Sequence, residues 1–307
     1  MAFTAADVKK LREMTNVGMM DCKKALTASD GDMDKAVEWL REKGLAAAAK
    51  KSGRIAAEGA VCAMVENGVG AIVEINCETD FAAQSDKFTG FVQDVTQVVL
   101  QENPADMDAL LAAKYPGTDK TVSEMIPEKV LVIGENLKIR RFARYDTGVT
   151  VPYVHMGGRI GVLVNLEVEG IEPAAVTELG KDLCMQAAAM NPAFCDKSDV
   201  DQSTLDKEKE IQMALAMNEN EKAAKPKPQN IIEKMVMGRI GKYYEENCLM
   251  QMEFVKEKGV SVEQHVAAVA KELGGKIAVK SFIRFEKGEG IEKKQEDFAA
   301  EVAAQLK

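Results

Sequence analysis

The sequence has little that would place the protein in a membrane or outside the cell. No run of about 18 apolar residues occurs, which is the length that crosses a bilayer. The first 14 residues contain no apolar signal core, because they carry charges at Asp7, Lys9, Lys10, Arg12 and Glu13. The six dispersed cysteines form no CxxC pair, a usage typical of reduced thiols that pack in a core. We therefore expect a cytoplasmic protein that does not bind membranes.

The sequence also lacks the short motifs of common catalytic and nucleotide-binding sites. It has no GxxxxGK[ST] P-loop, no GxGxxG after a predicted strand, no HExxH and no GxSxG. The only two histidines, His155 and His265, exclude a His-rich metal site, and neither has a cysteine close in sequence for thiol catalysis. The absent P-loop opposes a nucleotide-binding GTPase or kinase. We expect no cofactor, no metal and no covalent chemistry, so the chain is not predicted to be an enzyme.

Basic residues are too few and too scattered for a nucleic-acid surface. Lysine and arginine number 40 against 49 aspartates and glutamates, which leaves a net charge of −9 without any large basic stretch. Phosphate contacts need clustered cations, so we expect no binding of nucleic acid. With 46% hydrophobic and 29% charged residues over 307 positions, the composition is that of a globular protein with more than one domain.

Three short amphipathic helices are predicted within residues 1–45, with Gly44 as the C-terminal cap of the third. The small, basic stretch 46–54 that follows is predicted to be a partly helical tether. Residues 1–54 thus form a three-helix domain and its tether. Its core is small, so it suits a binding module better than a catalytic domain.

A pattern of hairpin, helix and returning strand occurs twice in the rest of the chain. In each copy, two strands joined by a turn precede a helix that ends at an Asn-Pro pair, and a third strand follows. The first copy has predicted strands 61–65 and 69–75, a helix over 85–101 and a strand over 137–145; the second has strands 149–156 and 159–168, a helix over 176–190 and a strand over 277–285. The sequence therefore predicts an α+β fold with a duplicated core of antiparallel sheets, in subdomains 55–140 and 141–286.

The two copies differ in length. Residues 70–75 align with residues 161–166, and the second copy is about 50 residues longer from there to its third strand. The extra residues, about 194–246, are predicted to form an inserted helical hairpin (a coiled coil) with prolines at its tip. Its arms are marked by Leu205, Ile211 and Leu215 and by Ile232, Met235, Val236 and Ile240. Residues 287–307 are predicted to be a C-terminal helical module, whose apolar face can dock onto a partner and consists of Phe298, Val302 and Leu306.

Two segments carry residues that packing alone does not explain. Met19 and Met20 begin the second helix, where they face either the small core or, as adaptable apolar side chains, a partner. Phe81 follows a predicted strand and either folds back on the core or forms an apolar wedge. Asp80 beside it can compete for the water shell of a metal ion. The matching loop of the second copy has no aromatic residue, so the duplicated fold does not require one.

A third segment is the glycine-rich turn that begins at His155. It is either an ordinary glycine hairpin with an incidental histidine, or a place where His155 and Arg159 present a polar contact beside a close backbone approach. The residues alone leave both interpretations open.

Four stretches of the chain are similar to bacterial elongation factor Ts, and the resemblance extends over essentially the whole sequence. They are GMMDCKKAL from Gly18, the N-C-x-T-D-F segment from Asn76, H-x-G-x-RIGVLV from His155 and FIRFEKGEGIEK from Phe282. The resemblance implies a guanine-nucleotide exchange factor for elongation factor Tu. Such a factor binds the GDP-bound GTPase, disrupts its Mg²⁺ and P-loop contacts, and promotes GDP release so that GTP can bind. The factor itself binds no nucleotide.

The resemblance also implies which residues contact the GTPase domain of elongation factor Tu. The N-terminal domain is expected to have a ubiquitin-associated-like fold and to bind through Gly18, Met19, Met20, Asp21, Cys22 and Lys23. The segment that dislodges Mg²⁺ matches Thr79, Asp80, Phe81 and Ala82, with Phe81 as the wedge. A second contact matches His155, Met156 and Gly157. The C-terminal module is expected to pack on the same domain, and the hairpin to reach another domain. In some members the hairpin or the core forms a homodimer.

Some positions depart from the usual pattern of the family. Asn16 and Val17 stand where Gly and Ala are usual, and Gly18 is expected to keep the turn before the second helix. Ala82 replaces a usual valine, and Gln84 stands where a basic residue is common. The runner-up function is a non-catalytic adaptor that uses the same surfaces without driving exchange. For an adaptor, loss of the Phe81 ring weakens binding only as much as any lost contact.

Overall fold

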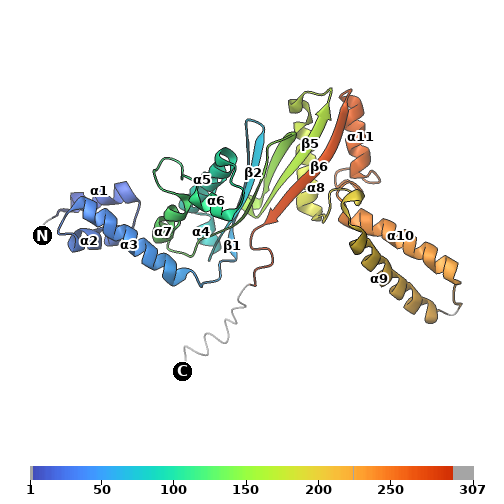
Figure 1. Cartoon of the computed structure of the whole chain (residues 1–307), viewed down its shortest axis with the longest axis horizontal. Helices are drawn as coiled ribbons and strands as arrows, with labels where there is room; N and C mark the ends of the chain where they lie inside the picture. The colour runs from blue at the N-terminus through green and yellow to red at the C-terminus, as the bar shows by residue number, and fades with distance from the viewer. Residues whose placement is uncertain (1–2, 224, 293–307) are drawn as a thin grey trace. The chain divides into compact units, whose positions relative to one another are not determined.

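The computed structural model describes residues 3–223 and 225–292, and the described chain divides into two compact units. The first unit contains residues 3–144, 154–161 and 285–292, and the second contains residues 145–153 and 162–284. The model is mixed helix and sheet, with two three-stranded antiparallel sheets (Figure 1), as expected for the α+β class.

The first unit begins with three helices, α1 (Ala5–Thr15), α2 (Met19–Ala28) and α3 (Met33–Lys51). Their buried apolar side chains form a small core of their own, which includes Leu11, Cys22, Leu26, Ala36 and Leu40. The three predicted helices are confirmed.

The expectation that Gly44 ends the third helix is wrong. α3 continues for two more turns to Lys51, so most of the predicted tether is helical. Gly44 instead lies where α3 packs on α7 (Val122–Ile133), and a Cβ atom there would be 3.0 Å from the carbonyl oxygen of Pro127. A glycine at this position lets two helices approach closely, a requirement that sequence spacing does not distinguish from a cap.

The turn before α2 is also made differently from our expectation. Gly18 has an ordinary φ of −58°, and a Cβ atom there would meet nothing within 4 Å. Asn16 supplies the left-handed conformation, with φ 55°, at the end of α1. Asparagine tolerates this region better than most residues, so the departure from glycine at this position keeps the turn.

The first sheet has the order β1-β2-β3. β1 (Glu58–Glu66) and β2 (Val69–Cys77) form an antiparallel hairpin with Glu66 opposite Val69, and β3 (Lys138–Tyr145) lies on the other side of β2. Asn67 and Gly68 have φ of 52° and 82°, as a tight hairpin turn requires. α5 (Asp86–Glu102) contacts both strands of the hairpin and buries Phe88 and Phe91. The short helices α4 (Asp80–Ala83) and α6 (Met107–Ala112) flank it.

The second sheet has the order β4-β5-β6, from β4 (Val149–His155), β5 (Ile160–Glu169) and β6 (Lys276–Glu286). The helix α8 (Thr177–Met190) ends at Asn191, as α5 ends at Asn103, and the two asparagines have nearly the same φ of 49° and 48°. The strand order of the sheet, the helix that follows the hairpin and the asparagine at the end of that helix are thus repeated in the second copy, as predicted. The remaining elements are η1 (Met156–Gly158), η2 (Pro173–Val176), η3 (Lys197–Asp199) and α11 (Val262–Glu272).

The predicted helical hairpin is formed by α9 (Gln202–Glu221) and α10 (Gln229–Asn247), which Figure 1 shows side by side and antiparallel. Its seam buries Ala216 against Ile232 and Val236. Of the apolar residues that mark the first arm in the sequence, Ile211 and Leu215 do not lie in this seam but are exposed. The contact face of α9 runs through Met213 and Ala216 instead, because a small alanine lets the two helices approach.

The predicted apolar face of the C-terminal module, Phe298, Val302 and Leu306, lies outside the described residues. Within residues 3–223 and 225–292, no helix combines the length and the apolar character needed to span a bilayer.

Candidate functional site

The segment Thr79–Ala82 directly follows β2 and forms the first turn of α4. Thr79 is the N-cap residue, and its hydroxyl accepts a hydrogen bond from the amide of Ala82 at 3.2 Å. Ala83 is buried and anchors the short helix. A cap and an anchor at the end of a sheet strand hold this turn in one conformation.

Glu135 holds the same segment through its carboxylate. This group accepts hydrogen bonds from the amides of Glu78 and Thr79, at 2.9 and 3.0 Å, and from the Thr79 hydroxyl at 2.6 Å. Hydrogen bonds to a charged acceptor are about twice as strong as neutral ones. Sequence reasoning missed Glu135, because it lies 56 positions from Thr79 and no local motif marks it.

Phe81 is the most exposed large apolar side chain of this segment. It is 86% exposed, so the interpretation that it folds back on the core is wrong. The Asp80 carboxylate beside it is also exposed, and it makes no ion pair within the described ranges. The structure thus presents an apolar ring and a free carboxylate next to each other on a rigid turn.

The second predicted contact segment, Gly18–Lys23, contains both exposed and buried side chains. Met19 and Met20 are exposed on α2, which removes the interpretation that they belong to the core. Lys23 is exposed as well, and Cys22 is fully buried, so its own contribution is to the packing of the three helices. Asp21 is half-buried and forms ion pairs with Lys43 of α3 and with Lys24.

The Asp21–Lys43 pair fixes α2 on α3. The hydrogen bond from Lys43 is the main cause of a lowered pKa for the Asp21 carboxyl, since it favours the charged form. The side chains of α2 that face outward are therefore carried on a helix that the buried Cys22 and Leu26 hold in the small core and that this ion pair also links to α3.

The third segment, His155–Gly157, forms a tight turn between β4 and β5. Met156, Gly157 and Gly158 have φ of 49°, 63° and 96°. Positive φ is costly for a methionine, and such strain is often found at functional sites. Met156 is 66% exposed. The close backbone approach occurs at Gly158, where a Cβ atom would be 3.0 Å from the Cβ of Ala60 on β1.

All three predicted segments belong to the first unit of the chain. Both α4 and the turn η1 contact β1, so the structure brings the segments Thr79–Ala82 and His155–Gly157 to the same strand. The segment Gly18–Lys23 lies on the three-helix part of the same unit.

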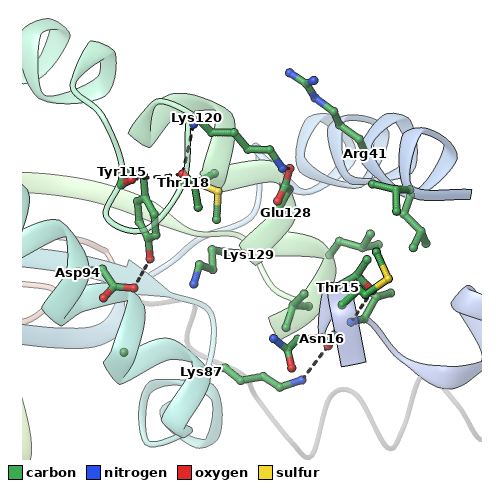
Figure 2. Close-up of a pocket in the computed structure, with 18 of the residues that line it drawn as sticks. Thr15, Asn16, Arg41, Lys87, Asp94, Tyr115, Thr118, Lys120, Glu128 and Lys129 are labelled. Carbon is green, nitrogen blue, oxygen red and sulfur yellow. Dashed lines mark hydrogen bonds and ion pairs between the residues drawn. The ribbon is translucent and has the colours of Figure 1, made fainter. Parts of the chain in front are cut away.

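A cavity of about 780 Å³ lies in the first unit between α1 and α3 on one side and α5 and α7 on the other. Figure 2 shows its walls, where Tyr115 donates a hydrogen bond to Asp94 and Lys87 contacts the carbonyl of Asn16 at 3.4 Å. Its charged residues are balanced: Arg41, Lys87, Lys120 and Lys129 against Glu38, Asp86, Asp94 and Glu128. The cavity contains none of the predicted contact residues, and its balanced charge favours no class of ligand.

The cysteines are packing residues, as their dispersal predicts. Five of the six are buried, and Cys62 is half-buried. Burial raises the pKa of Cys77 to about 12, and the nearby charge of Glu135 adds to this effect. A thiol with such a pKa is protonated at neutral pH and does not act as a nucleophile. Within the described residues, no three His, Cys, Asp or Glu side chains gather as a metal site would require.

Comparison with known proteins gives one consistent result. The profile of the family described as "Elongation factor TS" matches residues 78–289. "Elongation factor Ts" of Clostridium perfringens (strain SM101 / Type A) is 52% identical over 304 residues, which cover 98% of each chain. "Elongation factor Ts" of Clostridium botulinum (strain Alaska E43 / Type E3) is 49% identical over 307 residues, which cover 99% of each chain.

Proposed function

Since the chain belongs to the elongation factor Ts family, whose members act in translation elongation, we propose that it is the guanine-nucleotide exchange factor of elongation factor Tu. It binds the GDP-bound form of that GTPase, weakens the hold of Mg²⁺ and the P-loop on the nucleotide, and so speeds GDP release. It does this without covalent chemistry.

The observation that carries the proposal is the exposure of Phe81 on a capped, anchored turn. An exposed aromatic ring has no value for the stability of its own chain, whereas inside a partner it can push neighbouring side chains apart. Phe81 is the proposed wedge, and Asp80 places a negative charge beside the metal site of the partner. Because each 1.4 kcal/mol lost from nucleotide binding is about a tenfold loss of affinity, small displacements of the metal suffice.

The exposed residues of the other two segments supply binding energy for the complex. Met19, Met20 and Met156 are adaptable apolar side chains of the kind that serve protein contacts. We assign them to the GTPase domain of elongation factor Tu, together with Lys23 and His155. The coupling between bound factor and bound nucleotide is reciprocal, so GTP binding releases the factor.

The hairpin is the proposed contact with another domain of elongation factor Tu. Its outer faces expose apolar side chains that nothing in its own seam covers, namely Ile211, Leu215, Ile231 and Met237. A homodimer through the hairpin or the core is the other assembly that the family resemblance allows. The mass of the free chain in solution distinguishes the two assemblies, because a homodimer has twice the mass of the monomer.

Release of a fluorescent GDP from elongation factor Tu tests the proposal. Catalytic amounts of the chain are expected to accelerate release by several orders of magnitude, with each molecule acting on many GTPase molecules. Tight binding with an unchanged release rate would instead establish the adaptor. A titration of the chain alone with GDP should show no binding.

A further inference from the structure

Glu74 is a fully buried carboxylate in the middle of β2. It accepts hydrogen bonds from Arg140 at 2.9 Å and Arg141 at 2.6 Å, both on β3, and from the side chain of Asn76 at 3.1 Å. Its fourth donor is the backbone amide of Gly288, at 2.8 Å, which lies 214 positions away in sequence. A buried charge is tolerated only with partners of this kind.

The charged form of Glu74 is the stable one. Burial is the largest single influence and raises the pKa of this carboxyl. The amide of Gly288 and the two guanidinium groups together outweigh it and lower the pKa below its usual value. The carboxylate is therefore ionised at neutral pH and holds all four donors.

Gly288 is held against the first sheet by more than this bond. Its φ is 69°, and a Cβ atom there would be 2.0 Å from the carbonyl oxygen of Ala57, so no other residue fits. Next to it, the Lys287 ammonium pairs with Glu58 at 2.6 Å. Arg141 lies over the ring of Phe285 at 4.3 Å. The turn 286–289 is thus fastened to β1, β2 and β3.

The turn 286–289 also holds the contact segment at His155. The amide of Lys287 donates to the carbonyl oxygen of Arg159 at 2.9 Å, and the Arg159 side chain approaches Glu286 at 3.5 Å. Gly158 of the same turn lies close against Ala60 of β1. The chain of contacts runs from Glu74 through residues 286–289 to the turn 155–159, all within the first unit.

The second copy of the core shows that the strand itself does not need a carboxylate here. In the internal alignment Glu74 stands opposite Asn165, which is also buried. Among the described residues, the Asn165 side chain donates only to the carbonyl of Thr147, at 2.8 Å, in the turn that precedes β4. A short neutral side chain suffices for the fold of β5. The longer, charged side chain of Glu74 in β2 binds the turn 286–289, which is distant in sequence.

We propose that Glu74 is a positioning residue, which through Gly288 holds the turn 155–159 on β1, the strand that Thr79–Ala82 also contacts. The inference rests on the proposed function, because it assigns both segments to one partner. Two contacts carried on one rigid strand act together, and a loose turn at Met156 would contribute little.

A double-mutant cycle on GDP release tests the role in exchange. In the native chain, Met156→Ala is expected to lower the rate of GDP release at limiting concentrations of the chain about tenfold, a loss typical of one good interface contact. In a Glu74→Gln chain the same change is expected to cost less than about twofold, since residues that share a network are not additive. Phe81→Ala should cost the same factor in both backgrounds. Equal losses for Met156→Ala in both backgrounds would overturn the proposal.

Hydrogen–deuterium exchange of the chain alone tests the positioning without the partner. Glu74→Gln is expected to speed amide exchange in residues 155–161 and 286–290 by about tenfold or more, since local opening then costs less. The matched control is Asn165→Ala, a buried polar change at the equivalent strand position, and it should leave both stretches protected. Native protection of both stretches in Glu74→Gln would overturn the proposal.

The two measurements separate the two claims. A native chain that does not accelerate GDP release fails the proposed function, whereas amide exchange still decides whether Glu74 holds the turn. If Glu74→Gln does not fold, Glu74→Asp is used, because it keeps the buried charge for Arg140 and Arg141 but shortens the reach to the amide of Gly288. It must loosen the same two stretches, and unchanged protection there counts against the proposal.

Discussion

The hydroxyl of Thr79 donates a 2.6 Å hydrogen bond to the carboxylate of Glu135, a residue at the end of α7. The same carboxylate receives two backbone amides of the β2–α4 turn. The orientation of Phe81 therefore depends on a residue outside the three predicted contact segments. The proposed wedge can push on a partner only if the backbone that carries it stays in place, and the hydrogen bonds to Glu135 hold that backbone.

Glu135→Gln is expected to lower GDP release about tenfold, since losing the charge weakens three hydrogen bonds worth about 1 kcal/mol or more each. The Phe81 ring is still present in this variant, but the turn that carries it is held less firmly. Stopped-flow release of fluorescent GDP measures the effect. The matched control is Glu66→Gln at the far end of the same hairpin, where the carboxylate accepts a hydrogen bond from the side chain of Gln97. Equal effects of the two changes would argue against a specific role for Glu135.

Gly44→Leu is expected to destabilise the packing of α3 on α7, because even a Cβ atom there would be 3.0 Å from the Pro127 carbonyl oxygen. Overpacking of this kind costs about 1–3 kcal/mol. Trp39 is the only tryptophan and lies on α3, so its fluorescence in urea reports the transition. Gly238→Leu on α10 has open space and should raise stability slightly through helix propensity. An unchanged midpoint for Gly44→Leu would show that the two helices are not closely packed.

The features of the fold that local chemistry dictates were predictable from the sequence. The Asn67–Gly68 hairpin and the helix ends at Asn103 and Asn191 follow from residues that favour positive φ. The same local rules failed at Gly44, because the neighbour that requires a glycine there is Pro127, far away in the sequence.

The candidate site also contains some residues that the sequence indicates and others that it does not. Phe81 and Met20 could be singled out, since an aromatic or a methionine at a strand or helix start is unusual without a partner. Glu135 and Gly288 could not, because their role exists only once distant strands are brought together. In the sequence Gly288 is part of the stretch FIRFEKGEGIEK, which carries the family resemblance but does not show that the amide of this glycine binds Glu74.

The stability of the chain is expected to fall at high pH partly through Cys77. Its pKa is raised from 9.0 to about 12 on folding, so the folded state holds the proton more tightly. This contribution is complete below pH 9 and is lost between pH 9 and 12, at up to about 1.4 kcal/mol per pH unit. Urea unfolding at about pH 7, 8 and 10 measures it. The difference between the native chain and Cys77→Ala should be constant from about pH 7 to 8 and shrink at about pH 10. A constant difference over the whole range would contradict this prediction.

Phe81→Ala should leave the stability of the free chain unchanged, because the ring is 86% exposed and covers nothing. Phe88→Ala is the contrasting change, since that ring is fully buried and its loss costs about 3–5 kcal/mol. Thermal unfolding of the two variants checks this. A marked drop in the melting temperature of Phe81→Ala would mean that the ring packs on its own chain.

The most direct test of the account compares two losses caused by Phe81→Ala. One is the fall in the saturating rate of GDP release from elongation factor Tu, and the other is the fall in affinity for the nucleotide-free GTPase. A wedge that drives exchange predicts a rate loss clearly larger than the affinity loss, because the ring acts on the bound nucleotide. Equal losses would contradict the account and leave Phe81 as one contact among others of an adaptor.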